Sequence, residues 1–319
     1  MNLTANRLFA LRLAVSLLQG VAVWALYDSA PSLDRSTGSA LWSCALFVPT
    51  AAIAGLGNLQ LRTLVLWIAV AAVLCLGLGY HAGWREDGPD SLREAFFLAT
   101  LNACLLGLLF VCQSLVVAGE ADRRWIATFP TYFDVAWRHA TQLALAVLFT
   151  AVFFGFLLLG AELFELIKVG FPRRLLQSSW FWLPAMTVSF AVAIHFTDTR
   201  TAMVRGARTL VLGLLAWLLP LLTLIAVGFL AALPFTGLEP LWATKHATSI
   251  LLTTAIALIL LINSHFQDGS AESQRFAFLF HSRALAVLAL LPLTVLAVVG
   301  LKLRVDQHGW TPSRIVALA

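Results

Sequence analysis

Long apolar runs recur from one end of this sequence to the other, and the charged residues lie mostly between them. Each run is long enough, or nearly so, to cross roughly 30 Å of hydrocarbon as a helix. Strands of a membrane barrel would be about ten residues long and would alternate apolar with polar positions, whereas these runs are continuous and longer. Because a chain in lipid must satisfy its backbone hydrogen bonds internally, the pattern predicts membrane-spanning α-helices. The expected spans are 13–27, 40–56, 63–80, 95–118, 143–160, 180–196, 209–233, 248–263 and 284–301.

The composition supports this interpretation. Hydrophobic residues make up 60% of the chain and charged residues 12%, and the mean hydropathy is +0.88. A soluble domain would carry about a quarter charged residues. We therefore expect an all-α, polytopic transmembrane bundle in which residues 1–319 form a single transmembrane helical domain.

The net charge and the cysteines limit which partners and cofactors the sequence predicts. The net charge of +5 is spread over many loops without a basic block, so the lipid bilayer is the expected partner and nucleic acid is not. The four cysteines all fall inside predicted spans, and no CxxC or Cys/His cluster is present. We therefore expect no metal site and no cofactor. Lys and Arg are divided almost equally between the two sides, so the positive-inside rule gives only a slight preference for a cytoplasmic N-terminus.

The last residues begin another apolar run. Pro312 suits the first turn of a helix, with Thr311 as its N-cap, and residues 315–319 are apolar. The pattern predicts the start of a tenth span. We expect the sequence to be a fragment of a longer chain, truncated at its C-terminus.

The first group of candidate functional residues follows the fifth span. Glu162 and Glu165 share a helix face, and Lys168 is placed to pair with Glu165. One interpretation is a helix that leaves the membrane with its charged side chains extended into water. In the other, Glu162 lies at the lipid boundary, lines a polar cavity and binds a proton.

Strongly polar residues are scarce within the spans and at their edges, and they include Arg12, Gln19, Asn102, Gln113 and His195. They form no recognisable catalytic set, so no catalytic residue is assigned. His195 stands three residues before Asp198, which allows a His–Asp contact on one helix face. The alternative is a histidine that faces lipid headgroups at the end of its span.

Two polar turns follow the seventh and ninth spans, and we expect them on the same side of the membrane because two spans separate them. Trp242 is an interfacial anchor in this interpretation, and Lys245 and Arg304 would bind an anionic lipid headgroup. The alternative is two structural turns with aromatic anchors. Between them, Asn263 is expected to cap or bridge helices, and Asp268 is a further polar candidate.

Three strings in this region are distinctive: LPFTGLEPLWATKHAT, LINSHFQDG and LRVDQHGWTPSRI. They resemble motifs of an uncharacterised bacterial membrane-protein family, domain of unknown function 4153, and the resemblance extends over most of the chain. It implies a long multi-span inner-membrane protein, and it brings no activity, cofactor or catalytic residue. His308 stands where a tyrosine is more usual in the family, which argues against a strict catalytic role at that position.

Three functional hypotheses remain open. Transport or permeation of a small solute is favoured by the many spans and by the internal prolines Pro49, Pro220 and Pro292. A non-enzymatic scaffold or assembly partner for envelope proteins is favoured by the scarcity of charge within the spans. A lipid-modifying enzyme is third, because no spacing selects a pair of acids or bases.

Overall fold

The helices of the computed structural model confirm the predicted fold class. The structure describes residues 5–84, 91–166, 168–238, 241, 247–266 and 277–308, and within these residues it is helical without any strand. Nine of the described helices are long and apolar enough to cross a membrane, which agrees with the nine predicted spans. The beginning of a tenth span, at 311–319, lies outside the described residues.

The chain divides into two compact units, Met1–Gly206 and Ala207–Ala319. The helices of the first unit are α1 (Ala5–Ser29), α2 (Arg35–Gly55), α3 (Leu61–Trp84), α4 (Ser91–Asp122), α5 (Phe129–Leu166), α6 (Phe171–Gln177) and α7 (Ser179–Thr199). A 3₁₀ turn, η1 (Ala30–Ser32), separates α1 from α2. Helix α8 (Thr201–Thr236) starts at the end of this unit, and α10 (Ala247–Phe266) and α11 (Ala277–His308) belong to the second.

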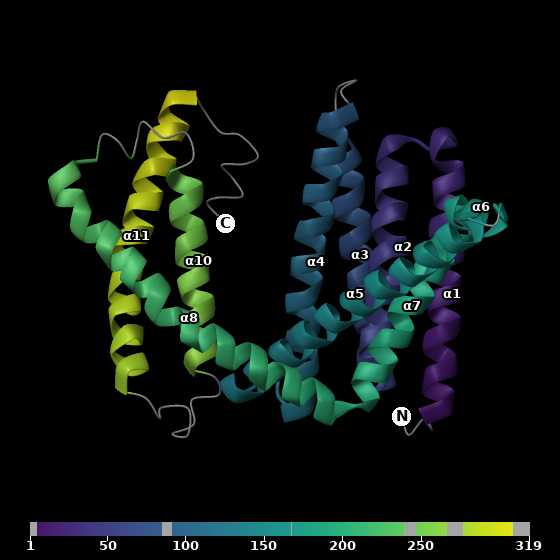
Figure 1. The fold of residues 1–319 in the computed structure, drawn as a ribbon, viewed down its shortest axis with the longest axis horizontal. Helices are drawn as coiled ribbons and strands as arrows, with labels where there is room; N and C mark the ends of the chain where they lie inside the picture. Colours follow the sequence, from purple (N-terminus) through teal and green to yellow (C-terminus); the bar gives the residue numbers. More distant parts are fainter. Residues whose placement is uncertain are drawn as a thin grey trace. The chain divides into compact units, whose positions relative to one another are not determined.

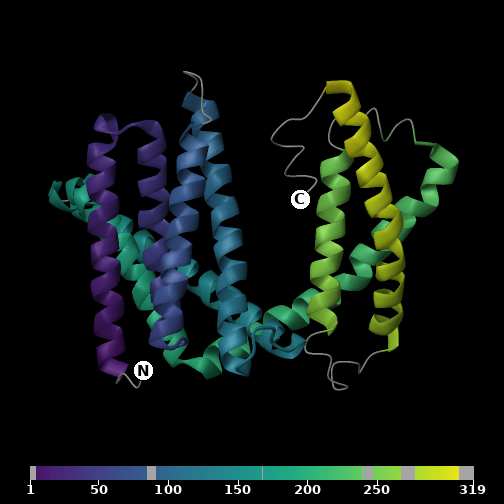
Figure 2. The ribbon, with the colours of Figure 1, turned by 180° about the vertical axis from the view of Figure 1, so that it is seen from behind.

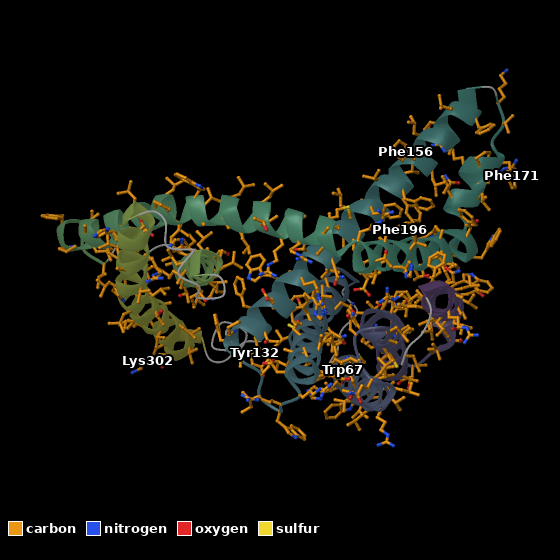
Figure 3. The ribbon with its side chains drawn as sticks, turned by 90° about the horizontal axis from the view of Figure 1, so that it is seen from below. Trp67, Tyr132, Phe156, Phe171, Phe196 and Lys302 are labelled. Carbon is orange, nitrogen blue, oxygen red and sulfur yellow. The ribbon has the colours of Figure 1, made fainter. Side chains whose placement is uncertain are left out.

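In the first unit, α1 to α4 stand side by side, as both ribbon views show (Figures 1 and 2). Helix α2 packs along α3, and α1 packs against both α2 and α7. Helix α5 begins beside α4 and then runs along α7 to the short α6 (Figure 3). The contact between α1 and α7 joins segments far apart in the sequence, and it positions the polar site described below.

Helix α5 is longer than the span predicted at 143–160, because it starts at Phe129. Pro130 occupies its first turn, where a missing backbone N–H costs no helical hydrogen bond. Asp122, the last residue of α4, caps this start: its carboxylate accepts hydrogen bonds from the backbone N–H of Thr128 (2.7 Å) and the hydroxyl of Thr131 (2.8 Å). Residues 129–142, which precede the predicted span, are therefore the first part of one continuous helix.

The second unit has its own apolar core. Leu219 and Ala226 of α8 meet Leu258 of α10 and Leu293 of α11 in a cluster from which solvent is excluded. Helices α10 and α11 lie side by side (Figures 1 and 2).

Candidate functional site

A partly open cavity of about 100 Å³ lies within the first unit, between α2, α4, α5 and α7. Its apolar wall includes Phe47, Phe110 and Phe190. The polar residues that line it are Thr50, Asn58, Gln113, His139, Gln142 and Asp198. The cavity therefore combines an apolar wall with a few polar groups, which is the usual character of a small-molecule site.

The polar groups lie toward the membrane side on which the N-terminus of the chain lies. Asp198 is the penultimate residue of α7, and Asn58 belongs to the turn after α2. Phe110 lies about 18 Å along α4 from its last residue, Asp122, at 1.5 Å per residue. Because the hydrocarbon is roughly 30 Å thick, the cavity extends from one interface to about the middle of the membrane.

An ion pair stands at the polar end of the cavity. Nη2 of Arg12, on α1, lies 2.5 Å from Oδ2 of Asp198. The other carboxylate oxygen, Oδ1, accepts a hydrogen bond of 3.1 Å from Nε2 of Gln142 on α5. The side chain of Arg12 is 1% exposed and that of Asp198 is 17% exposed. One carboxylate thus joins α1, α5 and α7.

Arg12 also binds the end of α2. Its Nη2 donates a hydrogen bond of 2.6 Å to the carbonyl oxygen of Leu56, the residue that follows the last turn of this helix. A cation is favourable there because the carbonyl groups at a helix C-terminus carry partial negative charge. The chain then turns at Gly57, whose φ of +92° is a conformation that glycine adopts without strain. The helix C-terminus therefore accounts for the position of Arg12, and the positive φ accounts for the glycine at position 57.

Two hydrogen-bonded pairs connect α4 to its neighbours α3 and α5 beside the cavity. The indole Nε1 of Trp67, on α3, donates to Oε1 of Gln113 on α4. Nδ1 of His139, on α5, lies 3.2 Å from the hydroxyl oxygen of Ser114 on α4. The remaining nitrogens, Nε2 of Gln113 and Nε2 of His139, are buried and have no hydrogen-bond partner.

Helix α2 contains an internal proline near the same site, and a backbone oxygen in the same stretch accepts two side-chain hydrogen bonds. Pro49 lacks an N–H, so the carbonyl oxygen of Ala45, four residues earlier, loses its helical donor. The carbonyl oxygen of Leu46 accepts hydrogen bonds from Nε2 of Gln19 on α1 (2.7 Å) and from the hydroxyl of Thr50 (2.7 Å). Gln19 also donates to that hydroxyl at 3.0 Å, which orients Thr50 at the cavity wall.

Glu162, a candidate from the sequence, lies on α5 with a 62% exposed side chain. Oε1 of Glu162 is 3.7 Å from Nη1 of Arg173 on α6, which is 49% exposed. Glu162 is not among the residues that line the described cavity. The side chain of Glu165 lies outside the described residues, and Lys168 has an exposed side chain in the turn between α5 and α6.

His195 lies on α7, one turn before Asp198. Its ring centroid is 4.7 Å from that of Phe9 on α1, and its Nδ1 is buried without a hydrogen-bond partner. The described hydrogen bonds of Asp198 come from Arg12 and Gln142, so the histidine is placed beside the ion pair as an aromatic contact of α1.

The remaining candidates belong to the second unit. Asn263 is exposed on α10. Trp242, Lys245 and Asp268 lie outside the described residues, as does the side chain of Arg304 on α11. The lipid-headgroup site at Lys245 and Arg304 therefore stays a prediction. So does the placement of the two polar turns on the same side of the membrane.

Sequence reasoning identified Arg12 and Gln113 as polar residues within spans but did not assemble them into a site. Asp198 entered only as a partner of His195, and His139 and Gln142 were not among the candidates. One signal for Asp198 was present: an arginine within a span requires a counter-charge at similar depth.

Comparison of the chain with protein-family models, curated proteins and solved structures finds no match.

Proposed function

We propose that this protein transports a small solute, or lets it permeate, across a bacterial inner membrane, with the cavity of the first unit as its solute site. The resemblance to the family of domain of unknown function 4153 supports only the location and the architecture in this proposal. The observation that carries the proposal is a cavity with polar groups that extends to about the middle of a set of membrane-spanning helices.

The polar groups support a functional role because burying them within a membrane is costly. A bundle needed only as a scaffold would be packed with apolar side chains, since these carry no desolvation penalty. Here an aspartate, a histidine and two glutamines line the space between four helices, and an arginine of α1 pairs with the aspartate. Binding sites of transporters lie near the middle of the membrane, which the cavity reaches from its polar end, and often beside helices with an internal proline, such as α2.

The test is a flux measurement on the full chain in vesicles of phosphatidylethanolamine and phosphatidylglycerol. The vesicles are shrunk osmotically with glycerol, urea or acetamide, and their re-swelling is followed by light scattering. We expect at least one solute to enter faster than in protein-free vesicles.

A matched pair of variants ties the flux to the cavity. Ala54→Leu places a larger side chain in the wall, whereas Ala52→Leu enlarges a half-buried residue of the same helix that does not line the cavity. Ala54→Leu is expected to abolish the flux and Ala52→Leu to preserve it. If no solute enters faster than in protein-free vesicles, the transport proposal is wrong and the scaffold hypothesis becomes the better one.

A further inference from the structure

The turn between α4 and α5 presents two arginines and two large apolar side chains away from the protein. Arg123 and Arg124 are exposed, Trp125 is fully exposed, and Ile126 is 79% exposed. In the described part of the chain, no carboxylate lies within ion-pair distance of either guanidinium group. Residues 123–126 are termed the basic turn.

Hydrogen bonds fix the backbone of the basic turn on both sides. The N–H of Arg124 donates a hydrogen bond of 3.0 Å to the carbonyl oxygen of Gly119 in the last turns of α4. The N–H of Ala127 donates one of 2.9 Å to the hydroxyl oxygen of Tyr132 on α5. The exposed side chains therefore project from an ordered turn, and a ligand does not have to order the loop in order to bind.

Arg123 has a backbone conformation that disfavours a side chain. Its φ is +54°, in the left-handed region that glycine occupies without strain. Glycine is the usual residue where a helix ends in this way, because a Cβ atom is unfavourable there. Residues held in such conformations concentrate at functional sites. The strain at Arg123 therefore indicates a use for its guanidinium group.

The length of α4 places the basic turn in a lipid headgroup layer. The membrane span of α4, Ala99–Asp122, has 24 residues and is about 36 Å long at 1.5 Å per residue. The hydrocarbon is roughly 30 Å thick, and the bilayer with both headgroup layers is about 40–45 Å thick. Residues directly after Asp122 therefore lie among headgroups, where tryptophan is enriched because its ring is apolar and its N–H is polar.

Three carboxylates near the basic turn are already bound within the protein. Oε1 of Glu120 accepts a hydrogen bond of 2.6 Å from the backbone N–H of Gln60, just before α3. Asp122 caps α5, and Asp198 is paired with Arg12. None of these carboxylates forms an ion pair with the basic turn.

A third arginine lies near the basic turn. The hydrogen bond from Gln60 to Glu120 brings the start of α3 beside the end of α4, and Arg62 is exposed two residues further on. Asp134, which is exposed on α5, forms no ion pair with Arg62 or with the basic turn. Three guanidinium groups are thus free to bind an anion at one headgroup layer. Arginine suits phosphate because its planar fork donates two parallel hydrogen bonds.

We propose that the basic turn, together with Arg62, binds the headgroup of an anionic phospholipid of the phosphatidylglycerol class. The guanidinium groups of Arg123 and Arg124 bind the phosphate, and Arg62 adds positive charge beside it. Trp125 and Ile126 pack against the glycerol and the first carbons of the acyl chains. None of these residues lines the cavity, so the site is independent of the proposed transport function.

Native mass spectrometry of the full chain in a non-ionic detergent measures the binding of added lipid. Phosphatidylglycerol is expected to bind about tenfold or more tightly than the zwitterionic phosphatidylethanolamine, because each arginine near the surface favours the anionic lipid. Equal affinities for the two lipids would overturn the proposal. So would displacement of phosphatidylglycerol by an equal concentration of sn-glycerol 3-phosphate, because the site would then recognise a soluble phosphate.

Two matched pairs of arginines locate the lipid. The double variant Arg123→Gln/Arg124→Gln should weaken the tightest phosphatidylglycerol binding about fivefold for each arginine removed. The control Arg173→Gln/Arg174→Gln removes the same charge from two exposed neighbours on α6, at the other end of α5, and should leave this binding unchanged. Equal losses in both variants would mean that the lipid responds to net charge alone, and the site would be disproved.

Arg123→Gly separates binding from folding. Glycine relieves the backbone strain, so the thermal midpoint in lipid-free detergent should rise while phosphatidylglycerol binding falls about fivefold. A rise in thermal midpoint with unchanged lipid binding would assign Arg123 no role in the site and contradict the proposal.

Trp125→Ser tests the apolar part of the site. It should weaken the binding of both lipids by a similar factor and so keep the preference for phosphatidylglycerol, whereas the double variant Arg123→Gln/Arg124→Gln should lose that preference. If the double variant keeps the full preference, the basic turn does not select the lipid and serves another partner, such as an acidic protein surface.

Discussion

Nη2 of Arg12 and Oδ2 of Asp198 lie 2.5 Å apart although 186 positions separate the two residues in the sequence. The pair fixes the beginning of the first helix against the end of the seventh. Gln142 and the carbonyl oxygen of Leu56 extend the same network to α5 and α2. The polar end of the cavity is therefore built from parts of four helices.

The two members of this pair should respond differently to substitution. Asp198→Asn leaves a guanidinium that is 1% exposed without its counter-charge, whereas Arg12→Gln leaves a carboxylate that is 17% exposed and keeps its bond from Gln142. We expect Asp198→Asn to lower the free energy of unfolding by about 3 kcal/mol or more and Arg12→Gln to lower it by less. Denaturant titration in detergent micelles measures both, with the exposed Arg62→Gln as a control near zero. A larger loss for Arg12→Gln would contradict this account.

Close packing of α2 on α3 depends on two glycines. A Cβ at Gly79 would lie 2.7 Å from Cα of Ala40, and a Cβ at Gly83 would lie 2.6 Å from the carbonyl oxygen of Arg35. Gly79→Ala and Gly83→Ala should each cost about 1–3 kcal/mol, because backbone atoms cannot move aside cheaply.

Gly77, on the same helix, is the matched control for these two substitutions. It has nothing within 4 Å of the added Cβ. Gly77→Ala should be neutral or stabilising by up to about 1 kcal/mol, since alanine favours helix. Equal thermal midpoints for all three variants would show that the contact between the helices is not tight.

The cap at the start of α2 predicts a pH dependence. The hydroxyl of Ser36 and the backbone N–H of Thr37 donate hydrogen bonds to Asp34, and these hold the pKa of its carboxyl below the ordinary value. Because the folded-state pKa is the lower one, the cap stabilises the fold above the unfolded-state pKa of about 4 and loses this effect as the pH falls through the folded-state value.

Asp34→Asn keeps a capping oxygen without a titrating group. The difference in thermal midpoint between the parent and this variant should therefore shrink as the pH falls from about 6 to about 3. A difference that grows on acidification would mean that the pKa of Asp34 is raised in the folded protein.

The sidedness of the first unit is testable with single cysteines in a variant that lacks the four native ones. Gln60 and Trp125 lie in turns on the side of the N-terminus, and Ser32 lies in the turn at the other ends of α1 and α2. We expect Gln60→Cys and Trp125→Cys to react with a membrane-impermeant maleimide from one side, and Ser32→Cys from the other. Labelling of all three from the same side would mean that a span is miscounted.

The exposed ion pair of Glu162 with Arg173 bears on the hypothesis that Glu162 binds a functional proton. Exposed pairs contribute about 0–1 kcal/mol, so Glu162→Gln should change the thermal midpoint little. It should also leave the pH dependence of any solute flux unchanged, because the residue lies outside the described cavity wall. Loss of that pH dependence in a folded Glu162→Gln protein would support the hypothesis.

The sequence by itself determined that this is an all-helical membrane protein and where each span lies. Run length and charge placement suffice for that, because hydrocarbon tolerates only apolar stretches with internally satisfied backbones. These features depend on residues close together in the chain.

Only the tertiary structure decided which polar residues meet. Arg12, His139 and Asp198 stand in three different helices, and each taken alone resembles a residue at a membrane boundary. Their association depends on α1 packing against α7 and on α5 passing beside both α4 and α7, and these contacts are set by side-chain shape at helix surfaces. Periodicity within one segment cannot specify which other segment that surface will meet, so the cavity became visible only with the helices in place.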